Sequence, residues 1–245
     1  VRRSRDPELA PEQKTLYRSN VMRMSFIAQD RADLGEAVKT LAQNMQNPKT
    51  CHMGDLKRAA RYLLYRPSVA LVYRQQRLPS RLTLSVDSDH AADKTTRKST
   101  TGMVMQLGNH TVKNTSNLQS AIGLNVSEAE YYALCHGAAH GLGMQAFLKD
   151  LGLSMQVLVQ SDSSSAKAFA SRRGLGKQRH VQTRFLWLQE RIAAGHLKIL
   201  KIRGEDNISD ILTKCVNGAL LARHCKTIGL RPVATKSHLQ KSTLT

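Results

Sequence analysis

The spacing of apolar residues in the first third of the chain predicts helices. In the stretch ADLGEAVKTLAQNMQNP, apolar side chains recur every three or four positions from Leu34 to Met45, and the pattern stops at Asn47-Pro48. A second stretch, CHMGDLKRAARYLLYRP, has the same spacing and ends before Pro67. We therefore predict a helical segment over residues 14–78, preceded by a charged, flexible lead-in at residues 1–13.

The pattern changes near Pro79, where strands and helices begin to alternate. LTLSVDS alternates apolar and polar residues, and TTGMVMQLG and HTVKNTS predict two more strands joined through Gly108-Asn109. A helix is expected from Ser127 to about Leu151, then the strand MQVLVQSDS, two helices, the strand HLKILKIRG and a last helix that begins in NISDILTKCV. This order predicts an α/β domain over residues 79–230, a mixed sheet flanked by helices, with residues 231–245 as a disordered basic tail.

The charge of the chain favours a polyanionic partner. The 245 residues carry a net charge of +19, which favours nucleic acid ahead of a membrane surface. No apolar run approaches the roughly 18 residues of a transmembrane helix, so we expect no membrane partner. The four cysteines are scattered, which indicates free thiols in an intracellular compartment, cytoplasmic or nuclear. The absence of an initial Met leads us to expect a piece of a longer polypeptide.

Two glutamates at the front of the helix in LNVSEAEYYAL allow two interpretations. Ser127 and Glu130 fit a capping box, in which Glu130 bonds back to the backbone of the N-cap. Alternatively, Glu130 serves chemistry, because it lies on the small-residue face with Ala133 and Gly137, where a carboxylate needs a partner.

Four acids lie at the ends of predicted elements: Asp87, Glu130, Asp162 and Asp210. Asp87 and Asp162 meet only if the first and fourth strands are neighbours, which the sequence does not prove. Carboxylates packed together repel one another, and divalent cations such as Mg²⁺ relieve that repulsion. Two such ions can hold and hydrolyse a phosphodiester.

Five motifs follow one another between Asp87 and Lys214. They are DSDHAADKTTRKSTTGMVMQLG, SEAEYYALCHGAAHGLGMQAFLKDLG, VQSDSSSAKAFA, GKQRHVQTRFLWLQERIAAGHLKILKI and DNISDILTK. In this order, and near this spacing, they are similar to the ribonuclease H domain of copia-type retrotransposon polyproteins. The resemblance implies an RNase H-like fold, a five-stranded mixed sheet with helices on both sides. It also carries the four metal-binding acids of the family onto Asp87, Glu130, Asp162 and Asp210, with two Mg²⁺ ions or Mn²⁺ as a substitute.

The resemblance implies an activity and partners. The expected reaction is endonucleolytic cleavage of the RNA strand of an RNA–DNA hybrid, by in-line attack of water that leaves a 3′-hydroxyl and a 5′-phosphate. Asp87 and Asp162 would be central ligands, Glu130 would bind one ion and orient the water, and Asp210 would bind the other. Glu128 would be an ordinary first-turn acid.

The segment from LYRSNVMRMSF to YLLYRP resembles the helical thumb or connection at the end of a reverse transcriptase. The polymerase palm and its paired aspartates are absent, so we expect no polymerase activity from this chain. The remainder of a reverse transcriptase polyprotein is therefore an expected partner.

A basic cluster lies between Asp162 and Glu190, a stretch without any acidic residue. It is formed by Arg172, Arg173, Lys177, Arg179, His180 and Arg184. These side chains are either a solvated loop or a ridge that contacts the phosphates of a bound duplex.

Two other readings remain. The family usually has Trp at the position of His90 and Asp at that of Gln182, so an inert nucleic-acid-binding fragment of a degenerate retroelement is the main alternative. An integrase-like strand-transfer enzyme is disfavoured, because its site would lack the fourth acid found here in DNISDILTK.

Overall fold

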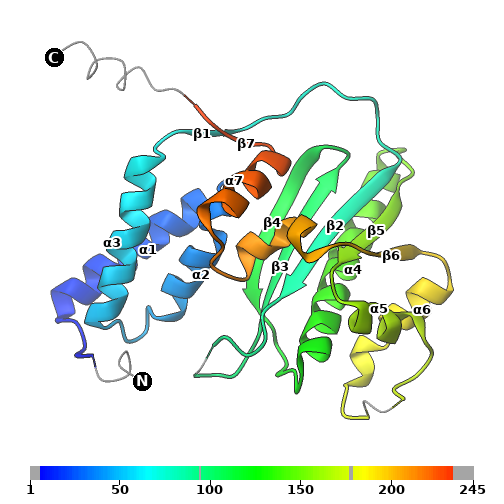
Figure 1. Ribbon diagram of the computed structural model, residues 1–245, viewed down its shortest axis with the longest axis horizontal. Coiled ribbons are helices and arrows are strands. Elements are labelled where there is room, and N and C mark those ends of the chain that lie inside the picture. Colours follow the sequence, from blue (N-terminus) through cyan, green and yellow to red (C-terminus); the bar gives the residue numbers. More distant parts are fainter. Residues whose placement is uncertain (1–5, 94, 177–178, 234–245) are drawn as a thin grey trace. The chain divides into compact units, whose positions relative to one another are not determined.

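The computed structural model describes residues 6–93, 95–176 and 179–233, and the chain divides into two compact units (Figure 1). Unit 1 comprises residues 1–72 and 229–245, and unit 2 comprises residues 73–228. In the part of the chain that is described, no helix is long and apolar enough to cross a membrane.

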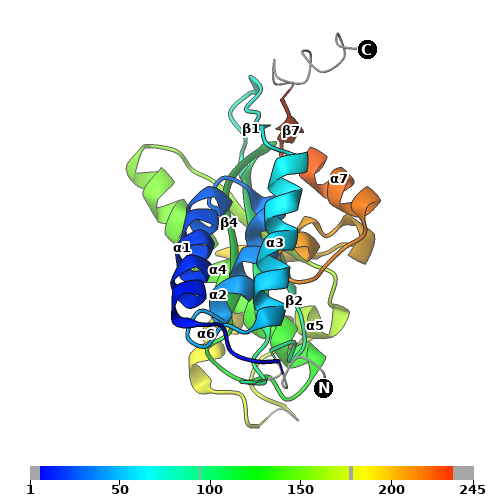
Figure 2. The same cartoon turned by 90° about the vertical axis from the view of Figure 1, so that its left-hand side faces the viewer.

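Unit 1 is built from three α-helices that lie side by side (Figure 2). They are α1 (Pro11–Ala28), α2 (Gly35–Gln43) and α3 (Thr50–Tyr65), with the short 3₁₀ helix η2 (Ala32–Leu34) before α2. The buried Tyr17 of α1 donates a hydrogen bond from its hydroxyl to the Leu41 carbonyl of α2 at 2.8 Å. The prediction of an N-terminal helical segment is confirmed.

A buried polar network fastens α3 within unit 1. The guanidinium of Arg31 makes two hydrogen bonds to the carboxylate of Asp33, at 2.9 and 2.8 Å, and the Tyr62 hydroxyl donates to the same carboxylate at 2.7 Å. Buried charges are tolerated when they are paired in this way, and a bidentate Arg–carboxylate pair has the most favourable geometry.

Unit 1 also contains a two-stranded antiparallel sheet that the hydrophobic pattern did not predict. Strand β1 (Val69–Leu71) pairs with β7 (Leu230–Pro232), about 160 positions later in the sequence, with Ala70 opposite Arg231. Arg231 and Pro232 of the predicted tail therefore lie in a strand, and residues 234–245 lie outside the described residues. The predicted domain boundary between residues 78 and 79 remains a prediction. Along the sequence, the first compact unit gives way to the second between residues 72 and 73.

The sheet of unit 2 has the strand order β4-β3-β2-β5-β6. The strands are β2 (Arg81–Ser88), β3 (Thr100–Leu107), β4 (His110–Leu118), β5 (Gln156–Ser161) and β6 (Leu197–Lys201). Strand β3 runs antiparallel to both β2 and β4, whereas β5 runs parallel to both β2 and β6. The predicted mixed sheet of five strands is confirmed, and the first and fourth predicted strands, β2 and β5, are neighbours.

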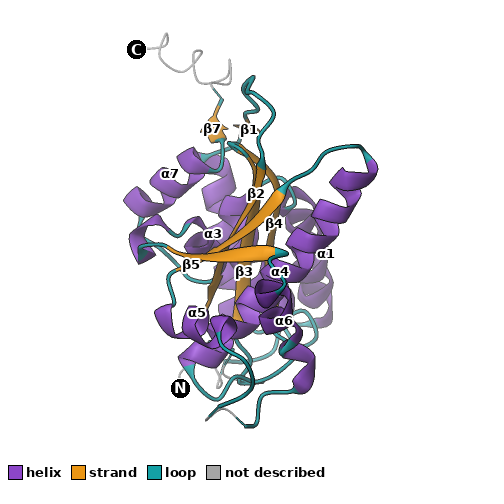
Figure 3. Ribbon diagram, turned by 90° about the vertical axis from the view of Figure 1, so that its right-hand side faces the viewer, coloured by secondary structure: helices purple, strands orange, loops and turns teal. Residues whose placement is uncertain are grey.

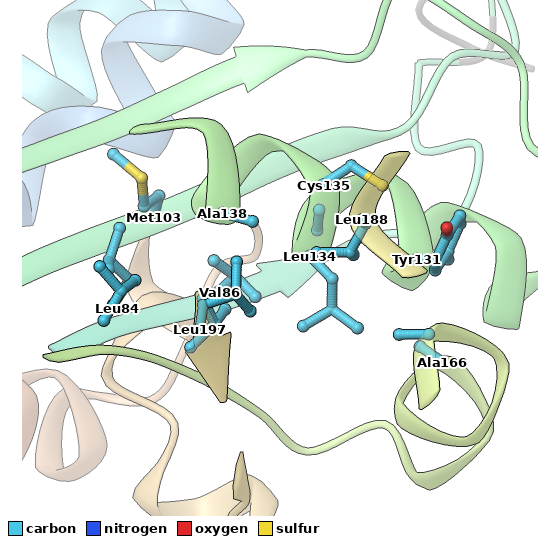
Figure 4. Close-up of a cluster of buried hydrophobic side chains, with 14 of the residues drawn as sticks. Leu84, Val86, Met103, Tyr131, Leu134, Cys135, Ala138, Ala166, Leu188 and Leu197 are labelled. Atoms are coloured by element: carbon cyan, nitrogen blue, oxygen red, sulfur yellow. The ribbon is translucent and has the colours of Figure 1, made fainter. Parts of the chain in front are cut away.

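Helices cover both sides of this sheet (Figure 3). They are α4 (Val126–Asp150), α5 (Ser164–Ser171), α6 (Trp187–Ala193) and α7 (Gly218–Thr227), with the 3₁₀ helices η3 (Thr183–Phe185), η4 (Gly204–Asp206) and η5 (Ile208–Leu212). The core lies between α4 and the strands, where Leu84, Val86 and Leu134 are fully buried (Figure 4). Gly137 lies so close to Val86 that a Cβ there would be 2.5 Å from a Val86 methyl group.

The segment η5 packs on the opposite side of the sheet. Val86 of β2 faces α4, and the next residue, Asp87, lies on the opposite face of the sheet because successive residues of a strand alternate. Gly102 of β3 pairs with Asp87 and lies on that same opposite face. A Cβ on Gly102 would lie 2.8 Å from the Ser209 carbonyl oxygen and 3.0 Å from Leu212 Cβ. Glycine at position 102 therefore allows η5 to approach the strands closely.

Three predicted helices differ in detail from the structure. The long helix begins at Val126, because the side chain of Asn125, and not Ser127, caps it by accepting from the Glu128 N–H at 2.9 Å. The helix predicted to end at Gly195 is divided into η3 and α6. The segment NISDILTKCV forms the short 3₁₀ helix η5, and the separate helix α7 follows it.

Candidate active site

Three acidic side chains converge where β2, α4 and β5 meet. Asp87 is the penultimate residue of β2, Glu130 is the fifth residue of α4, and Asp162 directly follows β5. One carboxylate oxygen from each lies within 4.8 Å of the other two. The parallel pairing of β2 and β5 places Ser85 beside Gln160, so the next two residues of each strand bring Asp87 and Asp162 to the same end of the sheet.

The fourth predicted acid, Asp210, is joined to this cluster through a lysine. Asp210 lies in η5 and is buried, with 6% of its surface exposed. The Lys214 ammonium is 3.0 Å from Asp210 Oδ2 and 3.8 Å from Asp87 Oδ2. Thr213, the preceding residue, donates a hydrogen bond from its hydroxyl to Asp87 Oδ2. One helical turn therefore supplies an acid, a hydroxyl and a cation to the site.

Burial makes ionisation of these carboxyl groups unfavourable. Burial raises the pKa of Glu130 to about 9, and the charges of Asp87 and Asp162 add to that effect. Burial also raises the pKa of Asp87 to about 6, although the Thr213 hydrogen bond and Lys214 oppose the shift. The pKa of Asp210 is raised by burial as well. Glu130, Asp87 and Asp210 therefore resist ionisation in the folded chain.

The donor atoms fit a hard divalent cation. Glu130 Oε2 and Asp210 Oδ1 are buried and have no hydrogen-bond partner within the described structure. Buried carboxylate oxygens without partners are costly, and Mg²⁺ or Mn²⁺ prefers oxygen ligands of this kind. The residues that would hold such ions are Asp87, Glu130, Asp162 and Asp210.

Comparison with curated proteins finds homologues that extend over most of the chain. It is 30% identical to the retrovirus-related Pol polyprotein from transposon TNT 1-94 of Nicotiana tabacum over 188 residues. This aligned region covers 76% of this chain and 14% of that protein. It is 26% identical to the retrovirus-related Pol polyprotein from transposon RE1 of Arabidopsis thaliana over 222 residues. That aligned region covers 89% of this chain and 15% of that protein. Over most of its length, the chain is homologous to retrovirus-related Pol polyproteins of copia-type transposons.

The family relationship covers most of this chain but only a small part of its relatives. The chain spans about a seventh of the length of the two Pol polyproteins. No protein-family model matches it. Among solved structures, LC11-RNase H1, isolated from compost, is similar with a TM-score of 0.38 and 18% identity, over 55% of this chain and 93% of that one.

Two amide side chains that the sequence reasoning missed hold the acid-bearing elements together. The Gln119 amide donates to Ser88 Oγ at 3.2 Å, to Thr101 Oγ1 at 3.0 Å and to the Ala129 carbonyl at 2.8 Å. It therefore links the end of β2, beside Asp87, to the turn of α4 that carries Glu130. Gln119 lies in a stretch without periodicity, so no local signal identifies it.

The Asn207 amide has the same function on the other side of the site. It donates to the Val86 carbonyl at 3.0 Å and to Asp162 Oδ1 at 3.4 Å, and Asn207 is fully buried. Asn207 and Lys214 both belong to the motif DNISDILTK, so the family resemblance had already singled out their segment. Their contacts could not be read from it.

Glu128 has a structural position, as the sequence suggested. Its carboxylate accepts hydrogen bonds from the Leu124 N–H at 3.0 Å, from His180 Nε2 at 2.8 Å and from the Tyr132 hydroxyl. Although burial opposes ionisation, the hydrogen bonds from Tyr132 and His180 lower the pKa of Glu128 below its usual value. The capping interaction therefore uses Asn125 and Glu128, and the predicted capping box of Ser127 and Glu130 is wrong.

Three residues of the predicted basic cluster make contacts within the chain. His180 bonds to Glu128, and Arg184 donates to Ser120 Oγ at 3.3 Å while its guanidinium lies 4.8 Å from the Phe185 ring centre. Arg172 donates to the Leu175 carbonyl at 2.8 Å. The remaining members are Arg173 and Arg179, which are exposed, and Lys177, which lies outside the described residues.

Proposed function

We propose that unit 2 is a divalent-metal-dependent ribonuclease H that cleaves the RNA strand of RNA–DNA hybrids within a retrotransposon Pol polyprotein. The observation that carries this proposal is the convergence of Asp87, Glu130 and Asp162, with Asp210 joined to them through Lys214. Four carboxylates at one edge of the sheet, inside a chain with a net charge of +19, suit the hydrolysis of a polyanion.

The proposed roles follow from the contacts of each acid. Divalent ions, when bound, would lower the pKa of water and stabilise the charge that develops on the phosphodiester oxygens. Asp87 is central, because its carboxylate lies near both the three-acid cluster and Lys214. Thr213 fixes the orientation of Asp87, and Asn207 fixes that of Asp162. Glu130, which has one oxygen without a hydrogen-bond partner, would supply a third ligand and would orient the attacking water.

The hybrid would be held by charge beside this site. Arg173 and Arg179 are exposed in the segment that follows α5, and the contact between His180 and Glu128 ties this segment to the first turn of α4. Phosphate contacts of this kind position a duplex without reading its sequence. The remainder of such a polyprotein would deliver the hybrid, because this chain spans only about a seventh of the length of the two Pol polyproteins.

A cleavage assay on a labelled RNA–DNA hybrid tests the proposal. We expect the purified chain to cut only the RNA strand in Mg²⁺ or Mn²⁺, and to lose this activity in EDTA. The Asp162→Asn variant should lose at least about a hundredfold in rate, because a ligand of the ions that stabilise the transition state is removed. Asp150→Asn, an exposed aspartate at the end of α4, is the matched control and should cleave as the unchanged chain does.

Tight hybrid binding by the folded chain without cleavage in either metal would overturn the proposal. That outcome would favour the inert nucleic-acid-binding fragment. Cleavage that survives Asp162→Asn would show that the activity comes from a contaminating nuclease or from another site.

A further inference from the structure

The Lys214 ammonium lies on one side of the acid cluster, in contact with two of the four carboxylates. It is 3.0 Å from Asp210 Oδ2 and 3.8 Å from Asp87 Oδ2. Half of the lysine side chain is exposed, whereas the two carboxylates it meets are 8% and 3% exposed. The lysine therefore brings a positive charge from the solvent side onto two buried acids.

The position of this ammonium is fixed by the backbone of a single turn. The N–H groups of Thr213 and Lys214 both donate to the Asp210 carbonyl, at 3.2 and 3.1 Å. This turn directs Asp210, Thr213 and Lys214 to the same place, and Thr213 and Lys214 both contact Asp87 Oδ2. The close packing of η5 on Gly102 holds the turn against the strands.

The two sides of the cluster differ in their positive charge. The Asp87, Glu130 and Asp162 oxygens gather within 4.8 Å of one another. Among the described residues no salt bridge joins a cationic side chain to the carboxylate of Glu130 or Asp162, and the Lys201 ammonium bonds to the main-chain carbonyl of Asp162. On the other side, Lys214 already bridges Asp87 and Asp210. Among the described residues, a cation that arrives at the first side meets two carboxylates, Glu130 and Asp162, with which no ammonium is paired. A cation that arrives at the second side meets an ammonium already paired with Asp210 and Asp87.

We propose that Lys214 is a tethered cation that occupies the Asp87–Asp210 side of the site and competes with a divalent ion for these two carboxylates. The inference rests on the proposed function, because it concerns the ions which that function requires. It makes the binding of two ions stepwise: the three-acid side fills first, and the second side fills only when the ammonium moves away. The flexible stem and partial exposure of the lysine allow that movement.

Metal titration by calorimetry tests the competition directly. We expect the unchanged chain to bind Mn²⁺ in a stronger and a weaker step. In Lys214→Met, the weaker step should tighten by about tenfold or more, because a unit charge about 4 Å away no longer opposes the ion. Lys214→Arg, which keeps the charge, should retain the weak second step. Lys149→Met, an exposed lysine at the far end of α4, is the matched control and should bind as the unchanged chain does.

A second readout does not require metal binding. In EDTA, Lys214→Met should melt at a lower temperature than Lys149→Met, since Asp87 and Asp210 lose their counter-charge, and Mn²⁺ should reduce the difference. Unchanged metal affinities, or a weaker second step, in Lys214→Met would overturn the inference while leaving the proposed nuclease intact. Failure of the unchanged chain to bind any Mn²⁺ or to cut the hybrid would instead overturn the proposed function and the inference with it.

Discussion

At the scale of single residues, Glu130 shows how the site opposes its own ionisation. It is buried, one of its oxygens has no hydrogen-bond partner, and two other carboxylates lie within 4.8 Å. Its pKa is about 9 in the folded chain, against an ordinary value of 4.5. A carboxyl group with a raised pKa contributes stability that is present below its ordinary pKa and is lost as the pH rises towards its folded value. The folded chain without metal should therefore become less stable between pH 4.5 and 9.

Replacing Glu130 by Gln should separate stability from activity. In EDTA at about pH 8, Glu130→Gln should be more stable than the unchanged chain by on the order of 1–3 kcal/mol, because the amide stays neutral. Near pH 4.5, where the unchanged side chain is neutral in the fold, the difference should nearly vanish. Thermal denaturation at both pH values measures it, and hybrid cleavage should be lost in the same variant.

The matched control for this prediction is Glu190→Gln, an exposed acid in α6, which should change stability little at either pH. Equal destabilisation of Glu130→Gln at both pH values would contradict the argument. It would mean that the carboxylate makes a stabilising contact in the absence of metal.

At the scale of elements, the approach of η5 to β3 depends on Gly102. A methyl group there would meet the Ser209 carbonyl at 2.8 Å, and a backbone atom cannot move aside as a flexible side chain can. Gly102→Ala should destabilise the chain by about 1–3 kcal/mol through this overpacking. It should also weaken the rise in melting temperature caused by Mg²⁺, because η5 carries Asp210.

The control is a glycine in the middle of α4 with open space around it. A Cβ at Gly143 would meet no atom within 4 Å, so Gly143→Ala should stabilise the chain by about 0.5–1 kcal/mol through better helix propensity. Circular dichroism melting curves of the two variants give the comparison. If both substitutions stabilise the chain equally, the close approach of η5 is wrong.

The elements that the sequence predicted well are those with a local signal. The strands of unit 2 show alternation of apolar and polar residues, and α1 to α4 show helical spacing bounded by proline or by capping residues. The start of α4 was misplaced because Asn125 and Ser127 are both good N-caps, and the choice between them depends on where Glu128 finds its partners. The pairing of β1 with β7 has no local signal, because each strand has only three residues and its partner is distant in the sequence.

The candidate site was predicted only in part for the same reason. Its four acids were identified from element ends and from the family motifs. The contacts of Gln119, Asn207 and Lys214 depend on which elements become neighbours in space. The sequence alone does not reveal the partner of an amide or ammonium side chain. The cluster of three acids needed the parallel pairing of β2 and β5.

At the scale of the whole molecule, an acidic site lies within a strongly basic chain. Neutralised phosphates release counter-ions, so hybrid affinity should fall with salt, with a log–log slope of about −0.9 for each phosphate contacted. In an Asp162→Asn background that cannot cut, the double substitution Arg173→Ala and Arg179→Ala should reduce the magnitude of the slope by up to about 2. Filter binding across a salt series measures this.

A substitution of Lys149, distant in sequence from the basic cluster, serves as the reference for that series and should leave the slope unchanged. Affinity that does not vary with salt would contradict an electrostatic grip on the hybrid. A slope that is steep but unaffected by the double substitution would move the phosphate contacts to another surface of the chain.

The pairing of β1 with β7 has a consequence for the connectivity of the polypeptide. The chain leaves unit 1 after β1 and returns to it at β7. Unit 2, residues 73–228, is therefore an insertion whose two ends are joined by the pairing of these two short strands. A single break in the backbone between residues 72 and 80 would leave unit 2 attached through Gly229. Release of unit 2 as a separate fragment would require two cuts, one after β1 and one before β7, and fragments for expression are best taken from Tyr73 to Ile228.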